Sequence, residues 1–133
     1  MEYYLAIDIG ASSGRHILGS VENGKLKLEE IYRFENGISK VSDEYCWDIN
    51  KLFENIKIGI KKCVELGKTP KSVGIDTWAV DFVLLDKKDE IIGNVVSYRD
   101  DRTEGMMEEV FKIIPKDMMY LYTGIQFQRF NTI

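Results

Sequence analysis

Asp8-Ile9-Gly10-Ala11-Ser12-Ser13-Gly14-Arg15 is the stretch that decides the fold of this 133-residue chain. It ends an apolar run, Tyr3 to Ile9, that is typical of a buried strand, and the segment that follows it, Arg15 to Val21, is again strand-like. Asn23-Gly24 is a strong hairpin signal and leads into a third strand predicted over Lys25 to Phe34. Strands joined by such short turns are antiparallel.

One helix and a further strand are predicted in the middle of the chain. Residues 35–46 are expected to form a polar loop, and Asp48 is a typical N-cap residue. Apolar residues then recur at spacings of three and four until Gly67, with Pro70 beyond, and a strand is predicted over Ser72 to Asp76. The order β-β-β-α-β predicts an α/β fold with a mixed sheet and flanking helices.

The last third of the chain has weaker signals. Two strands, Val80 to Leu85 and Glu90 to Val96, are predicted around a turn at Asp86 to Asp89. Helical spacing starts at Arg102 and is broken by Pro115, and a short helix is predicted over 116–122.

Composition excludes several classes of protein. The net charge of −4 gives no reason to expect nucleic-acid binding, and no run of 18 apolar residues predicts a membrane span. The N-terminus lacks the features of a signal peptide, so we expect a cytoplasmic protein. Cys46 and Cys63 are too far apart for a CxxC-type zinc site and are expected to be free thiols, with Cys63 in the core. His16 is interpreted as a strand residue.

The turn after the first strand has the chemistry of an anion site. Small residues let successive backbone N–H groups approach an anion, Ser12 and Ser13 add hydroxyl donors, and Arg15 adds a charged fork that suits phosphate oxygens. Asp8 would repel phosphate, and its natural role is to hold Mg²⁺ through water. The turn joins two strands and is therefore neither a Walker A loop nor a Rossmann fingerprint. Taken alone, these residues fit an ordinary Gly-Ser hairpin equally well.

The order of elements changes that balance. A strand ending in Asp-x-Gly, a phosphate hairpin and then β-β-α-β is similar to the ATPase domain shared by actin, hexokinase and sugar kinases. Within that group, the chain resembles the FGGY family of carbohydrate kinases, and most closely its rhamnulokinases. The resemblance spans nearly the whole chain and is carried by four segments: Asp8 to Arg15, Gly74 to Leu85, Tyr98 to Thr103, and Gly124 to Thr132.

The resemblance implies a ribonuclease H-like, actin-like ATPase domain. Residues 1–133 would form the truncated first lobe of a two-lobed kinase, with the second lobe absent. The reaction implied is transfer of the ATP γ-phosphate to the 1-hydroxyl of L-rhamnulose, with Mg²⁺. The catalytic base of the family lies beyond residue 133, so no base is expected here and the isolated chain is expected to be inactive.

The resemblance also implies roles for individual residues. The ATP phosphates would be contacted by Ala11, Ser12, Ser13, Gly14 and Arg15. The metal would be held through water by Asp8. The sugar site would be lined by Asp76, Thr77, Trp78, Ala79 and Asp81.

Two departures leave the sugar open. The family usually has glycine where this chain has Ala79, and often proline where it has Arg129, so another ketose or polyol such as xylulose or fuculose is an alternative substrate. A non-catalytic fragment that needs a second lobe is an alternative of another class. Its exposed cleft face would favour self-association.

Several polar residues have two interpretations. Asp76 and Thr77 either bind sugar or cap a strand end, and Trp78 either stacks on sugar or belongs to the core. Gln126 and Asn131 either reach sugar hydroxyls or satisfy backbone groups. The arginines and aspartates of residues 99–102 are expected to form a turn with local salt bridges, or to place Tyr98 or Arg99 at the pocket rim.

Overall fold

The computed structural model describes residues 1–131, which form two compact units. The first unit contains residues 1–38 and 47–79, and the second contains residues 39–46 and the described residues from 80 onward. Within this described part of the chain, no helix is long and apolar enough to cross a bilayer. The prediction that residues 1–133 are one first-lobe domain stays a prediction.

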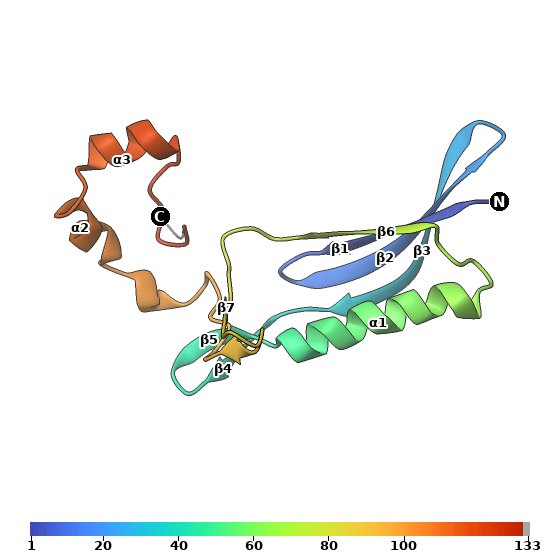
Figure 1. Cartoon of the computed structure of the whole chain (residues 1–133), viewed down its shortest axis with the longest axis horizontal. Helices are drawn as coiled ribbons and strands as arrows, with labels where there is room; N and C mark the ends of the chain where they lie inside the picture. Colours follow the sequence, from blue (N-terminus) through green and yellow to red (C-terminus); the bar gives the residue numbers. More distant parts are fainter. Residues whose placement is uncertain (132–133) are drawn as a thin grey trace. The chain divides into compact units, whose positions relative to one another are not determined.

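A four-stranded sheet organises the first unit (Figure 1). Its strand order is β3-β2-β1-β6, with β1 (Tyr3–Ile9), β2 (Ser13–Glu22), β3 (Lys25–Glu35) and β6 (Ser72–Thr77). The first three strands are antiparallel, whereas β6 runs parallel to β1 after the crossover helix α1 (Ile49–Glu65). The predicted mixed sheet and the order of these five elements are confirmed.

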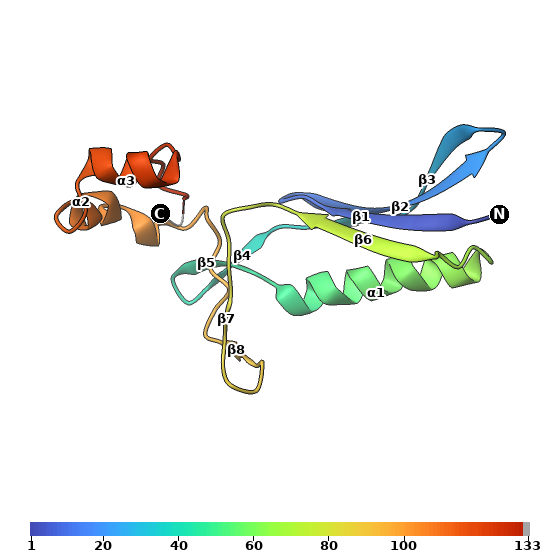
Figure 2. The same ribbon diagram turned by 45° about the horizontal axis from the view of Figure 1, so that its top comes forward.

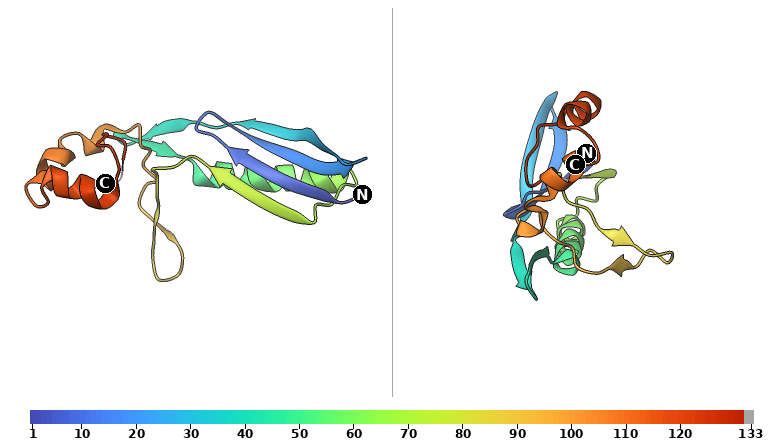
Figure 3. Two further views of the ribbon diagram at one scale, coloured as in Figure 1. Left: turned by 90° about the horizontal axis from the view of Figure 1, so that it is seen from above. Right: turned by 90° about the vertical axis from the view of Figure 1, so that its left-hand side faces the viewer.

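Helix α1 lies along one face of the sheet (Figure 2), as a second layer beneath the strands (Figure 3). Its start is fixed by Asp48, whose side chain accepts a hydrogen bond of 2.9 Å from the Lys51 N–H, as the sequence predicts. It ends just before Gly67, which adopts a φ of +65° that glycine tolerates without strain.

The core of the first unit lies between α1 and the sheet. Alternate residues of β1 point toward the helix, so Leu5, Ile7 and Ile9 are buried while their neighbours are not. They pack with Leu18 and Phe34 from the neighbouring strands and with Cys63 from α1, which is fully buried. Burial raises the pKa of the Cys63 thiol. Both cysteines are free, as predicted.

His16 is part of this core. It lies on β2, as predicted, and is fully buried. Its Nε2 is 3.2 Å from the carbonyl oxygen of Ile56, while Nδ1 has no hydrogen-bond partner. The ring fits because α1 carries Gly59 opposite it, where an added Cβ would come within 2.2 Å of the ring. Burial lowers the pKa of His16, so the neutral ring is the form that belongs to this packing.

Residues 35–46 are not the polar loop that the sequence predicts. They contain two short strands, β4 (Ile38–Val41) and β5 (Glu44–Trp47), which pair with each other. The turn between them uses Ser42 at a φ of +57°, a conformation in which glycine or asparagine is the usual signal. Without that signal, two four-residue strands cannot be told from a loop.

The hairpin of the second unit is much shorter than predicted. Only β7 (Leu84–Leu85) and β8 (Ile91–Ile92) pair. The turn between them is where the sequence places it, because the Asp86 carboxylate accepts hydrogen bonds from the N–H groups of Lys88 and Glu90. Val80 adopts a φ of +74°, which excludes it from a regular strand.

The first α-helix of the second unit begins later than predicted. Asp101–Thr103 form a short 3₁₀ helix, η1, and α2 (Met106–Phe111) starts only after Gly105, which has a φ of +79°. Pro115 precedes α3 (Lys116–Thr123), which ends at Gly124 with a φ of +64°. The predicted break at the proline and the short second helix are confirmed.

Candidate functional site

The turn between β1 and β2 is held by three hydrogen bonds to its own carbonyl groups. The Gly10 N–H donates to the Ser13 carbonyl at 2.9 Å. The other two bonds come from one residue after β3: the backbone N–H of Asn36 donates to the Ser12 carbonyl at 3.0 Å, and its side-chain amide donates to the Gly10 carbonyl at 2.9 Å. The turn is therefore fixed from the side of β3.

Gly14 is required by packing at this turn. An added Cβ would lie 2.1 Å from Cζ of Phe34, a buried ring on β3. In the sequence alone, the only reason for this glycine is the close approach of an anion. The structure gives a second reason, since Gly14 and Phe34 are also register partners.

Four charged residues lie in one row across the sheet. Asp76 on β6, Asp8 on β1, Arg15 on β2 and Arg33 on β3 are successive register partners. Because Ile7 and Ile9 point toward α1, Asp8 and its row point to the opposite face. Two negative charges thus stand beside two positive charges on the open face of the sheet.

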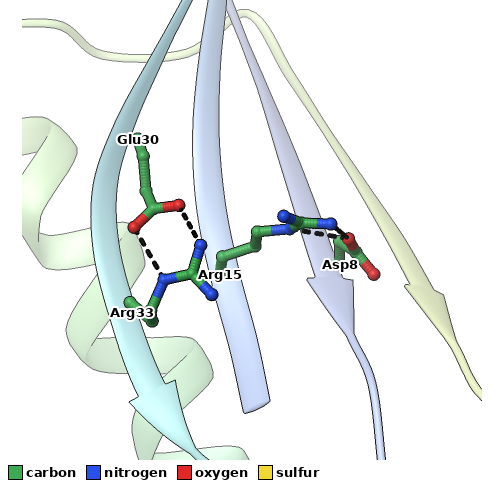
Figure 4. Close-up of polar contacts among 4 residues, drawn as sticks. All are labelled: Asp8, Arg15, Glu30 and Arg33. Carbon is green, nitrogen blue, oxygen red and sulfur yellow. Dashed lines mark hydrogen bonds and ion pairs between the residues drawn. The ribbon is translucent and has the colours of Figure 1, made fainter.

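The charges of this row are paired in part (Figure 4). Nε and Nη2 of Arg15 donate to one carboxylate oxygen of Asp8 at 2.8 Å and 2.7 Å. Arg33 forms a fork with Glu30 of the same strand, and this pair raises the pKa of Arg33 and lowers the pKa of Glu30. All four side chains are at least 41% exposed, so solvent weakens both pairs.

The carboxylates of the row suit a magnesium ion that shares its ligands with a substrate. Asp8 and Asp76 stand at the ends of two adjacent parallel strands. Among residues 1–131 no cluster of three or more His, Cys, Asp or Glu side chains forms a protein cage for a metal. Mg²⁺ is usually held by one or two carboxylates, its own waters and substrate phosphates, so the donor set fits.

The residues predicted for the sugar site include the end of β6 and an aromatic contact. Asp76 and Thr77 are the last two residues of β6, and Ala79 is exposed. Trp78 packs against the core cluster and against Trp47, with ring centroids 4.3 Å apart. Trp47 is only 4% exposed, so its ring serves the packing of the first unit.

The second unit has a cavity of about 250 Å³. It is mostly apolar, and its polar lining includes Asp81, Tyr98, Arg102, Gln126 and Asn131. Asp81 is the predicted sugar-site residue that lines it, whereas Asp76, Thr77, Trp78 and Ala79 belong to the first unit. The grouping of all five in one sugar site stays a prediction.

The polar residues around this cavity mostly serve the local fold. The buried Asp100 carboxylate accepts hydrogen bonds from the backbone N–H groups of Tyr45 and Arg102, both at 2.8 Å, and the first of these bonds is the main cause of its lowered pKa. Asp101 pairs with Arg129 rather than with a neighbouring arginine. The side chain of Asn131 donates to the Gln126 carbonyl at 2.8 Å, which is the backbone-satisfying role left open by the sequence.

Asn36 contacts the turn and was not predicted from the sequence. It lies outside the segment that carries the anion chemistry, 21 positions after Arg15 in a predicted loop. An asparagine directly after β3 indicates a contact with the turn only once the register of β2 and β3 is known.

Comparison with known proteins gives one consistent result. The model of the FGGY family of carbohydrate kinases, N-terminal domain, matches residues 3–133. The chain is 58% identical over 129 residues to a rhamnulokinase of Oceanobacillus iheyensis, and 59% identical over 133 residues to a rhamnulokinase of Halalkalibacterium halodurans. These alignments cover 97% and 100% of the chain but only 27% and 28% of the two relatives.

Solved structures share the fold at much lower identity. A xylulose kinase from Brucella ovis superposes with a TM-score of 0.74 at 14% identity, covering 98% of this chain and 27% of that one. A Plasmodium falciparum glycerol kinase solved with ADP gives a TM-score of 0.74 at 17% identity, with the same coverage of 98% and 27%. The expected actin-like ATPase fold of sugar kinases is therefore confirmed.

Proposed function

The chain belongs to the FGGY family of carbohydrate kinases, and from this premise we propose that its protein transfers the γ-phosphate of ATP to the 1-hydroxyl of L-rhamnulose. The identity to two rhamnulokinases, 58% and 59%, supports this sugar. The chain spans about a quarter of the length of these relatives, so the activity is proposed for the whole protein.

The observation that carries the nucleotide side is the turn between β1 and β2. The carbonyl groups of Gly10, Ser12 and Ser13 accept internal hydrogen bonds. Among residues 1–131, the N–H groups of Ala11 and Ser12 donate to no other residue. With the hydroxyls of Ser12 and Ser13 and the guanidinium of Arg15, the turn offers several hydrogen-bond donors. Successive backbone amides of a tight turn can bind phosphate.

Asp8 and Arg15 form a pair that ligands can replace. Their ion pair is 41% and 45% exposed, and exposed pairs contribute only about 0–1 kcal/mol. In the proposed complex Arg15 turns from Asp8 to the phosphates, and Asp8 is freed to hold Mg²⁺ through water. When bound, the ion neutralises charge that develops on the transferred phosphoryl group. The pair would thus hold both side chains in place in the absence of ligands.

The residues proposed for the sugar are Asp76, Thr77, Trp78, Ala79 and Asp81. Carboxylates accept hydrogen bonds from sugar hydroxyls, and the exposed Ala79 backbone suits close approach of a small ring. Because glycine is usual in the family at Ala79, a kinase for another ketose or polyol is the second candidate. Self-association through exposed apolar surface stays a prediction that light scattering tests.

This chain binds and orients the reactants, and we assign it no catalytic base. Phosphoryl transfer depends mainly on positioning and on stabilising charge, with a base beside the attacking hydroxyl. The phosphate turn and the carboxylates at the ends of β1 and β6 supply the positioning and the charge stabilisation. We propose that the base lies outside residues 1–133.

A substrate panel tests the proposal. The intact protein is incubated with Mg-ATP and, in separate assays, with L-rhamnulose, L-fuculose and D-xylulose, and ADP release is followed. We expect the largest kcat/KM for L-rhamnulose. An Ala79→Gly variant should change kcat/KM for the sugars and leave KM for ATP unaltered. A larger kcat/KM for another sugar would replace L-rhamnulose with the second candidate, and no ADP release with any sugar would contradict the kinase.

A further inference from the structure

Asn36, the residue after β3, donates two hydrogen bonds to the turn between β1 and β2. Its backbone N–H holds the Ser12 carbonyl, and its side-chain amide holds the Gly10 carbonyl, at 3.0 Å and 2.9 Å. The two carbonyls flank the tip of the turn between β1 and β2, so one residue binds both sides of that tip. Asn36 is half-buried and therefore partly shielded from competing water.

Holding a carbonyl also fixes the direction of an amide. A trans peptide unit is planar, and its C=O and N–H point in opposite directions. The Gly10 carbonyl belongs to the same unit as the Ala11 N–H, and the Ser12 carbonyl to the same unit as the Ser13 N–H. Both peptide bonds are trans, since residues 1–131 contain no cis peptide. Drawing the two carbonyls toward Asn36 therefore turns the Ala11 and Ser13 amides away from it.

We propose that Asn36 is a positioning residue of the phosphate turn, which holds the Gly10 and Ser12 carbonyls aside so that the turn presents N–H groups to the nucleotide. This inference rests on the proposed function of the turn as the ATP-phosphate site. A carbonyl free to rotate toward the phosphates would place a negative partial charge against an anion. The effect of Asn36 is thus on nucleotide affinity and reaches the phosphates only through the backbone of the turn.

The side-chain half of this contact is open to substitution. Asn36→Leu keeps the shape and removes the amide donor, so the Gly10 carbonyl loses its partner while the backbone bond to Ser12 remains. Asn36→Gln restores a donor on a longer side chain. Asn94 offers a matched control, because its side-chain amide also donates one bond, of 2.8 Å, to Glu44 in the second unit. Asn94→Leu removes a comparable bond far along the chain from the turn.

The test measures nucleotide affinity and kinetics of the intact protein. We expect Asn36→Leu to raise the Kd for Mg-ATP and KM for ATP about tenfold, as loss of one hydrogen bond predicts. KM for the sugar and kcat should stay within about twofold, Asn36→Gln should recover part of the loss, and Asn94→Leu should leave the Kd unchanged. Melting temperatures of all variants show whether each one folds.

The outcomes separate this inference from the proposed function. If wild type binds Mg-ATP and folded Asn36→Leu and Asn36→Gln bind it equally well, the positioning role is overturned and the phosphate turn survives. If Asn36→Leu does not fold, a folded Asn36→Ala variant, which also lacks the amide donor, takes its place, and an unchanged Kd for that variant overturns the role. If the wild-type protein binds no Mg-ATP, the proposed function and this inference are both overturned. Affinity for Mg-ATP without turnover of L-rhamnulose overturns the sugar alone.

Discussion

On one face of the β3-β2-β1-β6 sheet, α1 covers buried residues such as Ile7 and His16; on the other, Arg15 stands 45% exposed beside Asp8. The covered face is fixed by shape, since His16 fits only because Gly59 has no side chain. The open face is held by ion pairs that solvent screens and ligands can replace. Rigid packing on one side thus leaves the charged groups on the other free to change partners, and the turn that joins β1 to β2 lies at the end of both.

The largest predicted change in stability comes from adding a single methyl group to the covered face. Gly59→Ala would normally stabilise a helix by about 1 kcal/mol. Here the methyl group would come within 2.2 Å of the buried His16 ring, so we expect a net loss of about 2 kcal/mol in the free energy of unfolding. Chemical denaturation of the purified protein measures the change.

The control for this variant is Gly19→Ala on β2. Its added Cβ would lie 3.6 Å from the nearest atom, an ordinary contact, so the free energy of unfolding should change by less than about 1 kcal/mol. Adding His16→Ala to Gly59→Ala should recover part of the loss, because the ring that causes the clash is gone. A Gly59→Ala protein more stable than wild type would show that the covered face adapts freely.

Acid should weaken the covered face. His16 is the only histidine of the chain, and burial lowers its pKa from the ordinary value of 6.5. Between that lowered pKa and 6.5, the unfolded chain binds a proton at His16 that the folded protein does not bind. The free energy of unfolding therefore falls as the pH drops below 6.5, and above pH 6.5 the full contribution of neutral His16 is retained. Unfolding free energies measured from pH 7.5 to pH 5 should fall in wild type.

His16→Gln is the matched variant for the acid effect. Glutamine retains a donor for the Ile56 carbonyl and does not titrate, so the decline attributed to His16 should disappear. Carboxylates contribute to acid sensitivity in both proteins and cancel in the comparison. If the free energy of unfolding fell equally steeply with pH in wild type and variant, protonation of the buried His16 ring would not destabilise the fold. That result would contradict the packing described here.

The smallest effect is expected on the open face. Arg33→Gln and Glu30→Gln, singly and together, remove an exposed pair whose closest atoms are 2.6 Å apart. A double-mutant cycle should give a coupling below about 1 kcal/mol, decreasing with added salt. A coupling of several kcal/mol that is insensitive to salt would contradict the view that these pairs contribute little to the fold.

The sequence predicted the first unit well because its signals are local. The apolar run of β1, the Asn23-Gly24 turn and the Asp48 cap each act over a few residues, and the structure confirms all three. The β4-β5 pair and the late start of α2 were missed, since Ser42 gives no turn signal and Gly105 interrupts a spacing that looks continuous.

The candidate site was predictable in part. The anion chemistry of Asp8 to Arg15 can be recognised in one segment, but contacts between distant segments cannot. The fit of Phe34 over Gly14, the pair of Asp101 with Arg129 and the bond from Asn36 to Gly10 each depend on the folded register. Local sequence carries the donors of the turn, whereas Asn36, which we propose orients them, lies just after β3.

The central claim is that the turn between β1 and β2 binds the phosphates of a nucleotide. The direct measurement is the Kd for Mg-ATP of the intact protein, compared with a Ser12→Ala, Ser13→Ala, Arg15→Gln triple variant. Arg33→Gln is the control, because Arg33 is the register partner of Arg15 on the next strand and lies outside the turn. We predict that the triple variant weakens binding about a hundredfold or more and that the control matches wild type. A folded triple variant that binds Mg-ATP as tightly as wild type would contradict the claim.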